Sequence, residues 1–145
     1  MDNFAFEVVE TARLIRREAN RRAAVLGATG AQWRVLARLS LCNGVRQVDL
    51  AESLDVEPIT LCRMIDRLSE AGLVERRPDE EDRRAWRIHL TPKALPIIEK
   101  LRTLADSFLE DALAGVSAEE QQSVTDVLAR IRGNLTGGAT ARRAS

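Results

Sequence analysis

The spacing of apolar residues switches from helical to alternating at Gly72 and back again after Leu90, and this switch limits the folds open to the chain. Before Gly72, apolar residues recur every three or four positions, as in amphipathic helices. In residues 73–77 and 85–90 they alternate with polar residues, as in strands. Residues 78–82 between them are polar and begin with proline, which is typical of a turn. The chain must therefore place one antiparallel hairpin among helices.

Residues that begin or end helices divide the rest of the chain. Proline in the first helical turn loses no hydrogen bond, glycine ends helices, and paired capping residues open them. The signals are Gly27 after a helix over residues 4–26, a capping box at 29–32, a turn at 43–44 before a short helix over 47–54, Pro58 and Gly72 around a fourth helix, Thr91 and Pro92 before a fifth, and a second capping box at 117–120. Residues 137–145 are small and polar, which predicts a disordered tail.

The charge balance excludes a uniformly basic nucleic-acid binder. Lys plus Arg and Asp plus Glu both number 22, and the only two lysines are Lys93 and Lys100. The remaining cations are arginine, which forks onto phosphates and guanine edges, although codon bias toward arginine would give the same total. Only the placement of arginine on particular faces can therefore support nucleic-acid binding.

Other features exclude most enzymes and membrane proteins. His89 is the single histidine, and Cys42 and Cys62 have no neighbours at zinc-ligand spacing. We expect no enzyme activity, no metal and no cofactor. No apolar run approaches the length of a membrane span, and the start lacks a basic segment followed by an apolar one, so we expect a cytoplasmic protein without membrane contact.

The order of the predicted elements is that of a winged helix-turn-helix, in which a short helix, a turn and a second helix precede a two-stranded hairpin. The predicted fold class is mainly α with a small antiparallel β-hairpin, in one domain over residues 1–136. Residues 30–91 are its expected DNA-binding part. The long helices over about 4–26 and 92–136 carry more apolar surface than this part can cover, so we expect them to form a homodimer.

The helix that starts at Pro58 has two different faces. Leu61, Ile65 and Leu68 form an apolar stripe that must face a core. The other face carries groups able to reach base edges and phosphates in a major groove. The candidate DNA-binding residues of this helix are Pro58, Thr60, Arg63, Met64 and Arg67. The alternative is an ordinary surface helix whose polar face is solvated.

The turn of the hairpin carries a second group of candidate DNA-binding residues: Asp82, Arg83, Arg84 and Arg87. In an extended segment Asp82 and Arg84 point the same way, so we expect the carboxylate to fix the guanidinium for entry into a minor groove. The alternative is a solvated turn of mixed charge. Four consecutive acids, at residues 79–82, would repel phosphate unless the loop directs them away from it.

Four segments of the chain together resemble the MarR family of regulators, and its SlyA-type branch most closely. They are EPITLCRMIDRL at residues 57–68, AGLV at 71–74, DRRA at 82–85 and IHLTPKA at 88–94. The resemblance implies an obligate homodimer that represses or activates from a pseudo-palindromic operator. It places Thr60 and Arg63 in the major groove and Arg84 in the minor groove. It also implies release from DNA by a small aromatic or phenolic acid, or by oxidation of a cysteine.

A pocket for such an acid is expected beside the first two helices. Trp33 would stack on a ring, and Arg13 or Arg16 would pair with a carboxylate. The alternative is that Trp33 is a core residue. Residues 4–26 contain no cysteine, which argues against the peroxide-sensing mechanism of the family.

Two other functions remain open beside the DNA-binding regulator. A winged-helix module that binds proteins, without specific DNA binding, would have the same elements. An enzyme is disfavoured because the chain has no nucleophile elbow, phosphate loop or metal set.

Overall fold

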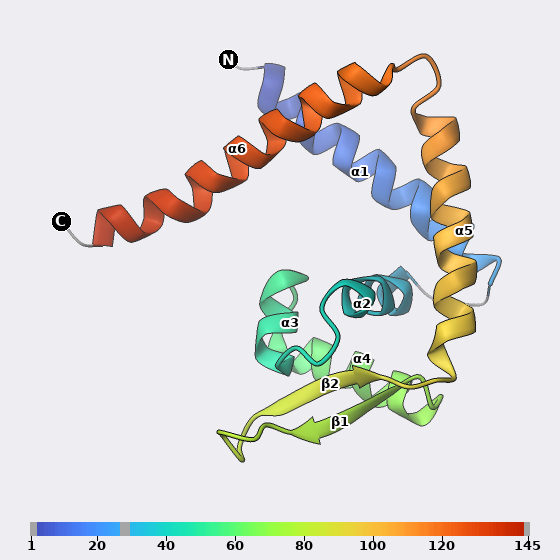
Figure 1. The fold of residues 1–145 in the computed structure, drawn as a ribbon, viewed down its shortest axis with the longest axis vertical. Coiled ribbons are helices and arrows are strands. Elements are labelled where there is room, and N and C mark those ends of the chain that lie inside the picture. The colour runs from blue at the N-terminus through green and yellow to red at the C-terminus, as the bar shows by residue number, and fades with distance from the viewer. Residues whose placement is uncertain (1–2, 27–29, 144–145) are drawn as a thin grey trace. The chain divides into compact units, whose positions relative to one another are not determined.

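The structure is a computed structural model that describes residues 3–26 and 30–143, with side chains up to residue 137. Within these ranges the chain forms six helices and one two-stranded sheet (Figure 1). The elements are α1 Asn3–Ala24, α2 Gly30–Leu41, α3 Gln47–Ser53, α4 Pro58–Glu70, β1 Val74–Pro78, β2 Trp86–Leu90, α5 Ala94–Ala112 and α6 Ala118–Arg143. The predicted mainly α fold with one hairpin is confirmed. The expected helix end at Gly27 and the capping residue Thr29 lie outside the described residues.

The described residues form two units, one up to Phe108 and one from Leu109 onward. The first unit holds a hydrophobic core built from α2, α3, α4, the hairpin and the start of α5. Leu61, Ile65 and Leu68 are fully buried in this core, as their spacing predicted. The apolar stripe therefore fixes which face of α4 is left for solvent.

The helix-turn-helix is formed by α3 and α4. Glu57 has an extended backbone, and α4 begins at Pro58 as expected. In the connection between the helices, Asp55 adopts a φ of 52°, a left-handed conformation that non-glycine residues rarely take. Gly72 has a φ of 77° and ends α4, which lets the chain turn directly into β1.

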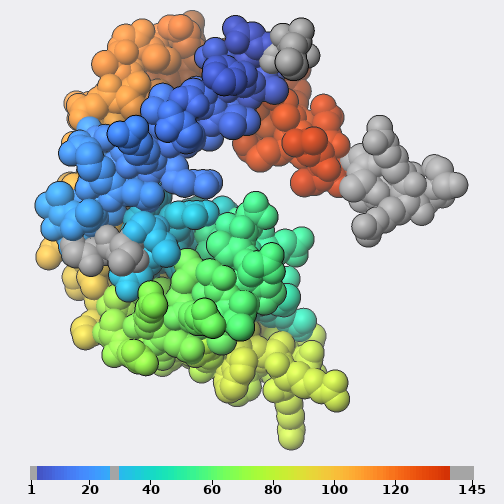
Figure 2. Space-filling view, turned by 180° about the vertical axis from the view of Figure 1, so that it is seen from behind, coloured from blue at the N-terminus to red at the C-terminus, as the bar shows by residue number. Residues whose placement is uncertain are grey.

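The hairpin pairs β1 with β2 in an antiparallel register that runs from Val74 opposite Leu90 to Pro78 opposite Trp86. Ile88 and Val74 are buried, whereas Trp86 and Pro78 at the other end are exposed. Trp86 therefore does not share the buried environment of Ile88, although residues two positions apart in a strand lie on the same face. The segment that contains the turn projects from the first unit in Figure 2, where it is yellow.

Helix α5 begins at Ala94, two residues later than the Thr91–Pro92 signal predicted, because the Thr91 hydroxyl donates a hydrogen bond to the carbonyl oxygen of Gly72 instead of capping a helix. Helix α6 opens with the predicted capping box. The backbone N–H of Glu120 donates to Ser117 Oγ, and the N–H of Ser117 donates to the Glu120 carboxylate, both at 3.1 Å. The helix continues to Arg143 instead of ending near residue 136, since a glycine costs only about 1 kcal/mol in a helix.

Candidate nucleic-acid interface

The solvent-facing side of α4 carries Thr60, Arg63 and Arg67, all exposed. Among the residues that the structure describes, the side chains of Arg63 and Arg67 have no hydrogen-bond or ion-pair partner. Met64 differs from the expectation, because it is half-buried and packs against the core cluster. The group available for contact with a partner is therefore Thr60, Arg63 and Arg67, with Pro58 exposed at the start of the helix.

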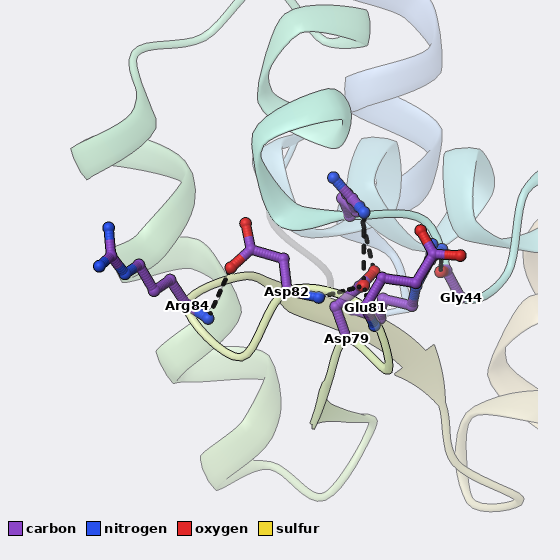
Figure 3. A network of polar contacts seen from close by, with 7 residues as sticks. Gly44, Asp79, Glu81, Asp82 and Arg84 are labelled. Carbon is purple, nitrogen blue, oxygen red and sulfur yellow. Dashed lines mark hydrogen bonds and ion pairs between the residues drawn. The ribbon is translucent and has the colours of Figure 1, made fainter.

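Arg83 and Arg84 in the turn of the hairpin are also exposed and have no side-chain partner within the described ranges. The Asp82 carboxylate does not hold the Arg84 guanidinium, so that prediction is wrong. It accepts a hydrogen bond of 3.0 Å from the backbone N–H of Arg84, which is the local pattern that aspartate favours in turns. In Figure 3 the Arg84 side chain extends away from the network around Asp79. Asp82 thus shapes the turn and leaves the guanidinium free.

Asp79 organises the hairpin, a role that the sequence did not reveal. Its side chain is only 1% exposed. It accepts hydrogen bonds from the backbone N–H groups of Glu81 and Asp82, at 2.9 and 3.0 Å. Arg46 and Arg87 donate to its other oxygen, at 3.0 and 2.7 Å. These contacts, the two backbone N–H groups foremost, hold the pKa of the Asp79 carboxyl well below its usual range.

Arg87 is part of this network around Asp79, which we call the Asp79 anchor. It is therefore not the free DNA contact that the sequence predicted. Besides its bond to Asp79, Arg87 Nη1 donates to the carbonyl oxygen of Gly44 at 2.9 Å (Figure 3). Gly44 lies between α2 and α3, so the network ties the hairpin to the helix-turn-helix. One of the four acids of the turn is thereby neutralised inside the protein, which reduces the expected repulsion of phosphate.

Arg76 holds α4 against the hairpin. Its Nη2 donates to the carbonyl oxygen of Cys62 at 3.1 Å, and its Nη1 lies 2.7 Å from a carboxylate oxygen of Asp66. Its Nε donates to Gln47 Oε1 at 3.1 Å, which adds α3 to the same junction. Arg76 was not a predicted site residue, because its partners are distant in sequence. It positions the helix that carries Arg63.

A separate cavity of about 530 Å³ lies between α1 and α2 and reaches the connection between α3 and α4. Its walls include Ile15, Arg16, Trp33, Arg34, Arg38 and Asp55. Arg16 and Trp33 are thus brought together as predicted. Burial lowers the pKa of Arg34, and the positive charges of Arg16 and Arg38 lower it further. Three guanidiniums around one cavity make an environment that favours an anion.

The structure differs from the prediction for Arg13 and adds a second contact for Trp33. Arg13 is exposed and pairs with Glu10, with Nε 3.0 Å from a carboxylate oxygen, and it does not line the cavity. Trp33 is half-buried, and its indole N–H donates to Asn20 Oδ1 at 2.8 Å, so it also serves the packing of α1 on α2. Trp33 therefore lines the cavity and also holds α1 against α2.

Comparison with known proteins shows which family has this arrangement of helices and hairpin. A sequence profile of the MarR family matches residues 29–86, a stretch that contains α2, α3, α4 and β1 and reaches the first residue of β2. The crystal structure of the transcriptional regulator PA3341 matches with a TM-score of 0.85, at 40% sequence identity over 92% of this chain and 98% of that chain. The chain belongs to the MarR family of transcriptional regulators.

Other MarR-family structures match over similar lengths. The transcriptional regulator SlyA is 27% identical, with a TM-score of 0.79 and coverage of 94% of this chain and 96% of that chain. Wild-type MarR from E. coli in its apo form is 25% identical, with a TM-score of 0.77 and coverage of 90% and 97%. None of the helices in the described ranges of this MarR-family chain has the length and apolar content of a membrane span.

The Asp79 anchor of this MarR-family chain predicts a specific dependence of stability on pH. Because the folded-state pKa of Asp79 is below the unfolded value of about 3.9, the unfolded chain takes up the proton first as pH falls. The stabilisation by Asp79 is therefore complete above about pH 4 and is progressively lost below it. Urea unfolding between pH 3 and 7 should show this loss in the wild type, and Asp79→Asn should be less stable near neutral pH and flatter in acid.

The neighbouring variant Glu80→Gln serves as the control, because Glu80 is exposed and no partner of its side chain occurs in the described ranges. Its unfolding should follow the wild type at every pH. Equal stability of wild type and Asp79→Asn near pH 7 would show that the network does not anchor the hairpin.

Proposed function

We propose that this chain is a homodimeric DNA-binding repressor that recognises a pseudo-palindromic operator and is released by a small aromatic acid. One observation carries the DNA-binding part: exposed arginines without partners among the described residues sit on α4 and on the hairpin turn, while Arg46, Arg76 and Arg87 bind other groups of the protein. Free guanidiniums on two projecting elements suit phosphate and base-edge contacts. No catalytic role is proposed for any residue.

In the proposed complex, α4 lies in the major groove and the hairpin turn reaches the adjacent minor groove. Arg63 and Thr60 would contact base edges, with Arg67 and Arg83 at phosphates and Arg84 in the minor groove. The geometric support is that Pro58, at the start of α4, and Arg84, in the turn, line the same cleft.

The homodimer rests on apolar side chains that each unit leaves exposed. In α1, Phe6 and Val9 are 63% and 68% exposed, and in α6, Val124 and Leu135 are 57% and 73% exposed. Apolar surface of this extent on long helices is typical of an interface. Twofold pairing would place the two α4 helices about 34–36 Å apart, one turn of DNA. Sedimentation equilibrium should give twice the monomer mass at micromolar concentration, and a monomer would contradict the proposal.

The cavity between α1 and α2 is the proposed effector site. Its volume falls in the range of about 300–1,000 Å³ typical of ligand pockets, and Arg16, Arg34 and Trp33 offer charge and an aromatic face. The cavity extends to Asp55 in the connection to α4, and Arg34, which also lines it, donates a hydrogen bond of 3.2 Å to the carbonyl oxygen of Leu54. Binding at the cavity could thereby reach the DNA-contacting helix.

Benzoate is the probe for this site, with cyclohexanecarboxylate as the non-aromatic comparison. Benzoate at about 100 times its Kd should stabilise the wild type by roughly 2.7 kcal/mol, measured as a rise in Tm. Arg16→Ala should reduce the rise strongly. Arg13→Ala is the matched control, because Arg13 lies about one turn away on the same helix, outside the cavity, and should respond as the wild type does. Equal responses of all three proteins would refute this site.

Selection from a random pool of duplexes tests the DNA-binding proposal. The full chain should enrich sequences with two inverted half-sites whose centres lie about one helical turn apart. Failure to enrich any sequence, with a purified and folded protein, would reject specific DNA binding and favour a winged-helix module that binds proteins.

A further inference from the structure

A small cleft lies between α3, the start of α4 and the hairpin, apart from the effector cavity. Its volume is about 200 Å³, and its walls include Arg46, Gln47, Val48, Pro58, Arg84 and Trp86. This is smaller than the range of about 300–1,000 Å³ that small-molecule pockets usually occupy. The cleft suits a thin segment of a larger partner better than a free ligand.

The cleft combines apolar walls with donors that have no acceptor inside the described part of the chain. Val48 is 61% exposed and Trp86 is 46% exposed, so neither is accounted for by the core. Arg84 has a free guanidinium. The Arg76 guanidinium donates to Gln47 Oε1, which leaves the amino group of the Gln47 amide as a donor. Arg46 uses Nε and Nη2 for Asp79, and Nη1 is not engaged.

Deoxyribose and phosphate match this combination. The sugar presents carbon atoms to apolar side chains, and the phosphate accepts from amide and guanidinium groups. The geometry of a duplex indicates where this backbone would lie on the protein, because one sugar–phosphate backbone separates a major groove from the adjacent minor groove. If α4 enters the first groove and Arg84 the second, that backbone must cross the surface between Pro58 and Arg84, which is the cleft.

We propose that the cleft seats the sugar–phosphate backbone between the two grooves, with Trp86 and Val48 against deoxyribose and with Gln47 and Arg46 toward phosphate. The inference rests on the proposed DNA binding and adds an apolar contact to it. In this arrangement, the contact of Trp86 with the backbone sets how deeply the hairpin turn enters the minor groove while α4 lies in the major groove. It carries no charge, so it contributes affinity without releasing counterions.

Two measurements test the inference on the full chain with a mixed-sequence duplex about three helical turns long. Trp86→Ala should bind about tenfold more weakly, the scale of losing one buried aromatic contact, without change in the slope of log affinity against log salt. Arg84→Ala should lower that slope. Trp86→Phe, which keeps an aromatic ring, should bind more tightly than Trp86→Ala. Urea unfolding of each variant checks that the fold persists.

Tryptophan fluorescence gives a direct readout, because Trp33 and Trp86 are the two tryptophans of the chain. Iodide should quench the half-exposed Trp86 in the free protein, and saturating duplex should protect it. In Trp86→Phe only Trp33 remains, and duplex should leave its quenching unchanged. If the wild type binds duplex but Trp86 stays accessible to iodide and Trp86→Ala binds equally well, the inference is overturned and DNA binding stands. If the wild type binds no duplex, both are overturned.

Discussion

Arg63→Ala is expected to lose about 1–3 kcal/mol of affinity for the selected operator, or roughly 5- to 150-fold, and to lose it at particular base pairs. Arg63 is exposed on α4 and has no partner among the described residues, so the substitution removes no internal contact. The free energy of unfolding should therefore stay within about 0.5 kcal/mol of the wild type. Fluorescence anisotropy with the operator and its single-base-pair variants measures both the size and the position of the loss.

Arg77→Ala provides the control for charge, since Arg77 is an exposed arginine on β1 that pairs with Glu75 and lies outside the proposed interface. Its affinity should match the wild type. If Arg63→Ala weakened every sequence equally, Arg63 would be a phosphate contact and the proposed base reading would be wrong. An unchanged affinity would remove α4 from the interface.

Ile65→Ala should lose about 2–5 kcal/mol of the free energy of unfolding, the largest effect on stability that we expect. Ile65 is fully buried in the core cluster, where α4 meets the other elements, and truncation leaves a cavity. Urea unfolding measures the loss. DNA affinity should fall with it whenever the unfolded fraction becomes appreciable.

Ile59→Ala is the matched control on the same helix, because Ile59 is 65% exposed. Its stability should change by less than about 0.5 kcal/mol. Similar losses in the two variants would contradict the assignment of the buried face, and with it the face that carries Thr60, Arg63 and Arg67.

Local features of the sequence were sufficient to predict the helices, the hairpin and the buried face of α4. The stripe of Leu61, Ile65 and Leu68 follows from helical geometry, and Gly72 is needed where the backbone adopts a positive φ. The Ser117–Glu120 box likewise joins residues three positions apart. Such signals depend on residues that are close in sequence, so they can be recognised without knowledge of the tertiary structure.

Which arginines bind other groups of the protein and which remain free could not be predicted in the same way. Arg83, Arg84 and Arg87 look alike in the sequence, but Arg87 is committed to Asp79 and Gly44. Asp79 reaches Arg46, which is 33 residues away, and this pairing depends on how the hairpin packs against the turn before α3. Sequence patterns indicate where arginines gather, whereas tertiary contacts determine which of them remain free.

These contacts explain how a protein with no net charge can leave particular arginines free for a partner. Arg46, Arg76 and Arg87 build the scaffold, and two of them neutralise a buried carboxylate beside the turn. The arginines of α4 and of the turn tip are left to solvent. Net charge is zero for the whole chain, and the proposed interface depends on the arginines that have no partner among the described residues.

The salt dependence of affinity for the selected operator tests the central claim most directly. Each protomer offers Arg63, Arg67, Arg83 and Arg84, and a dimer would double that set. Neutralising several phosphates predicts that log affinity falls linearly with log salt, with a slope of about −3 or steeper in the wild type and a shallower slope in Arg84→Ala. A flat response would contradict the claim that these free arginines grip a double strand.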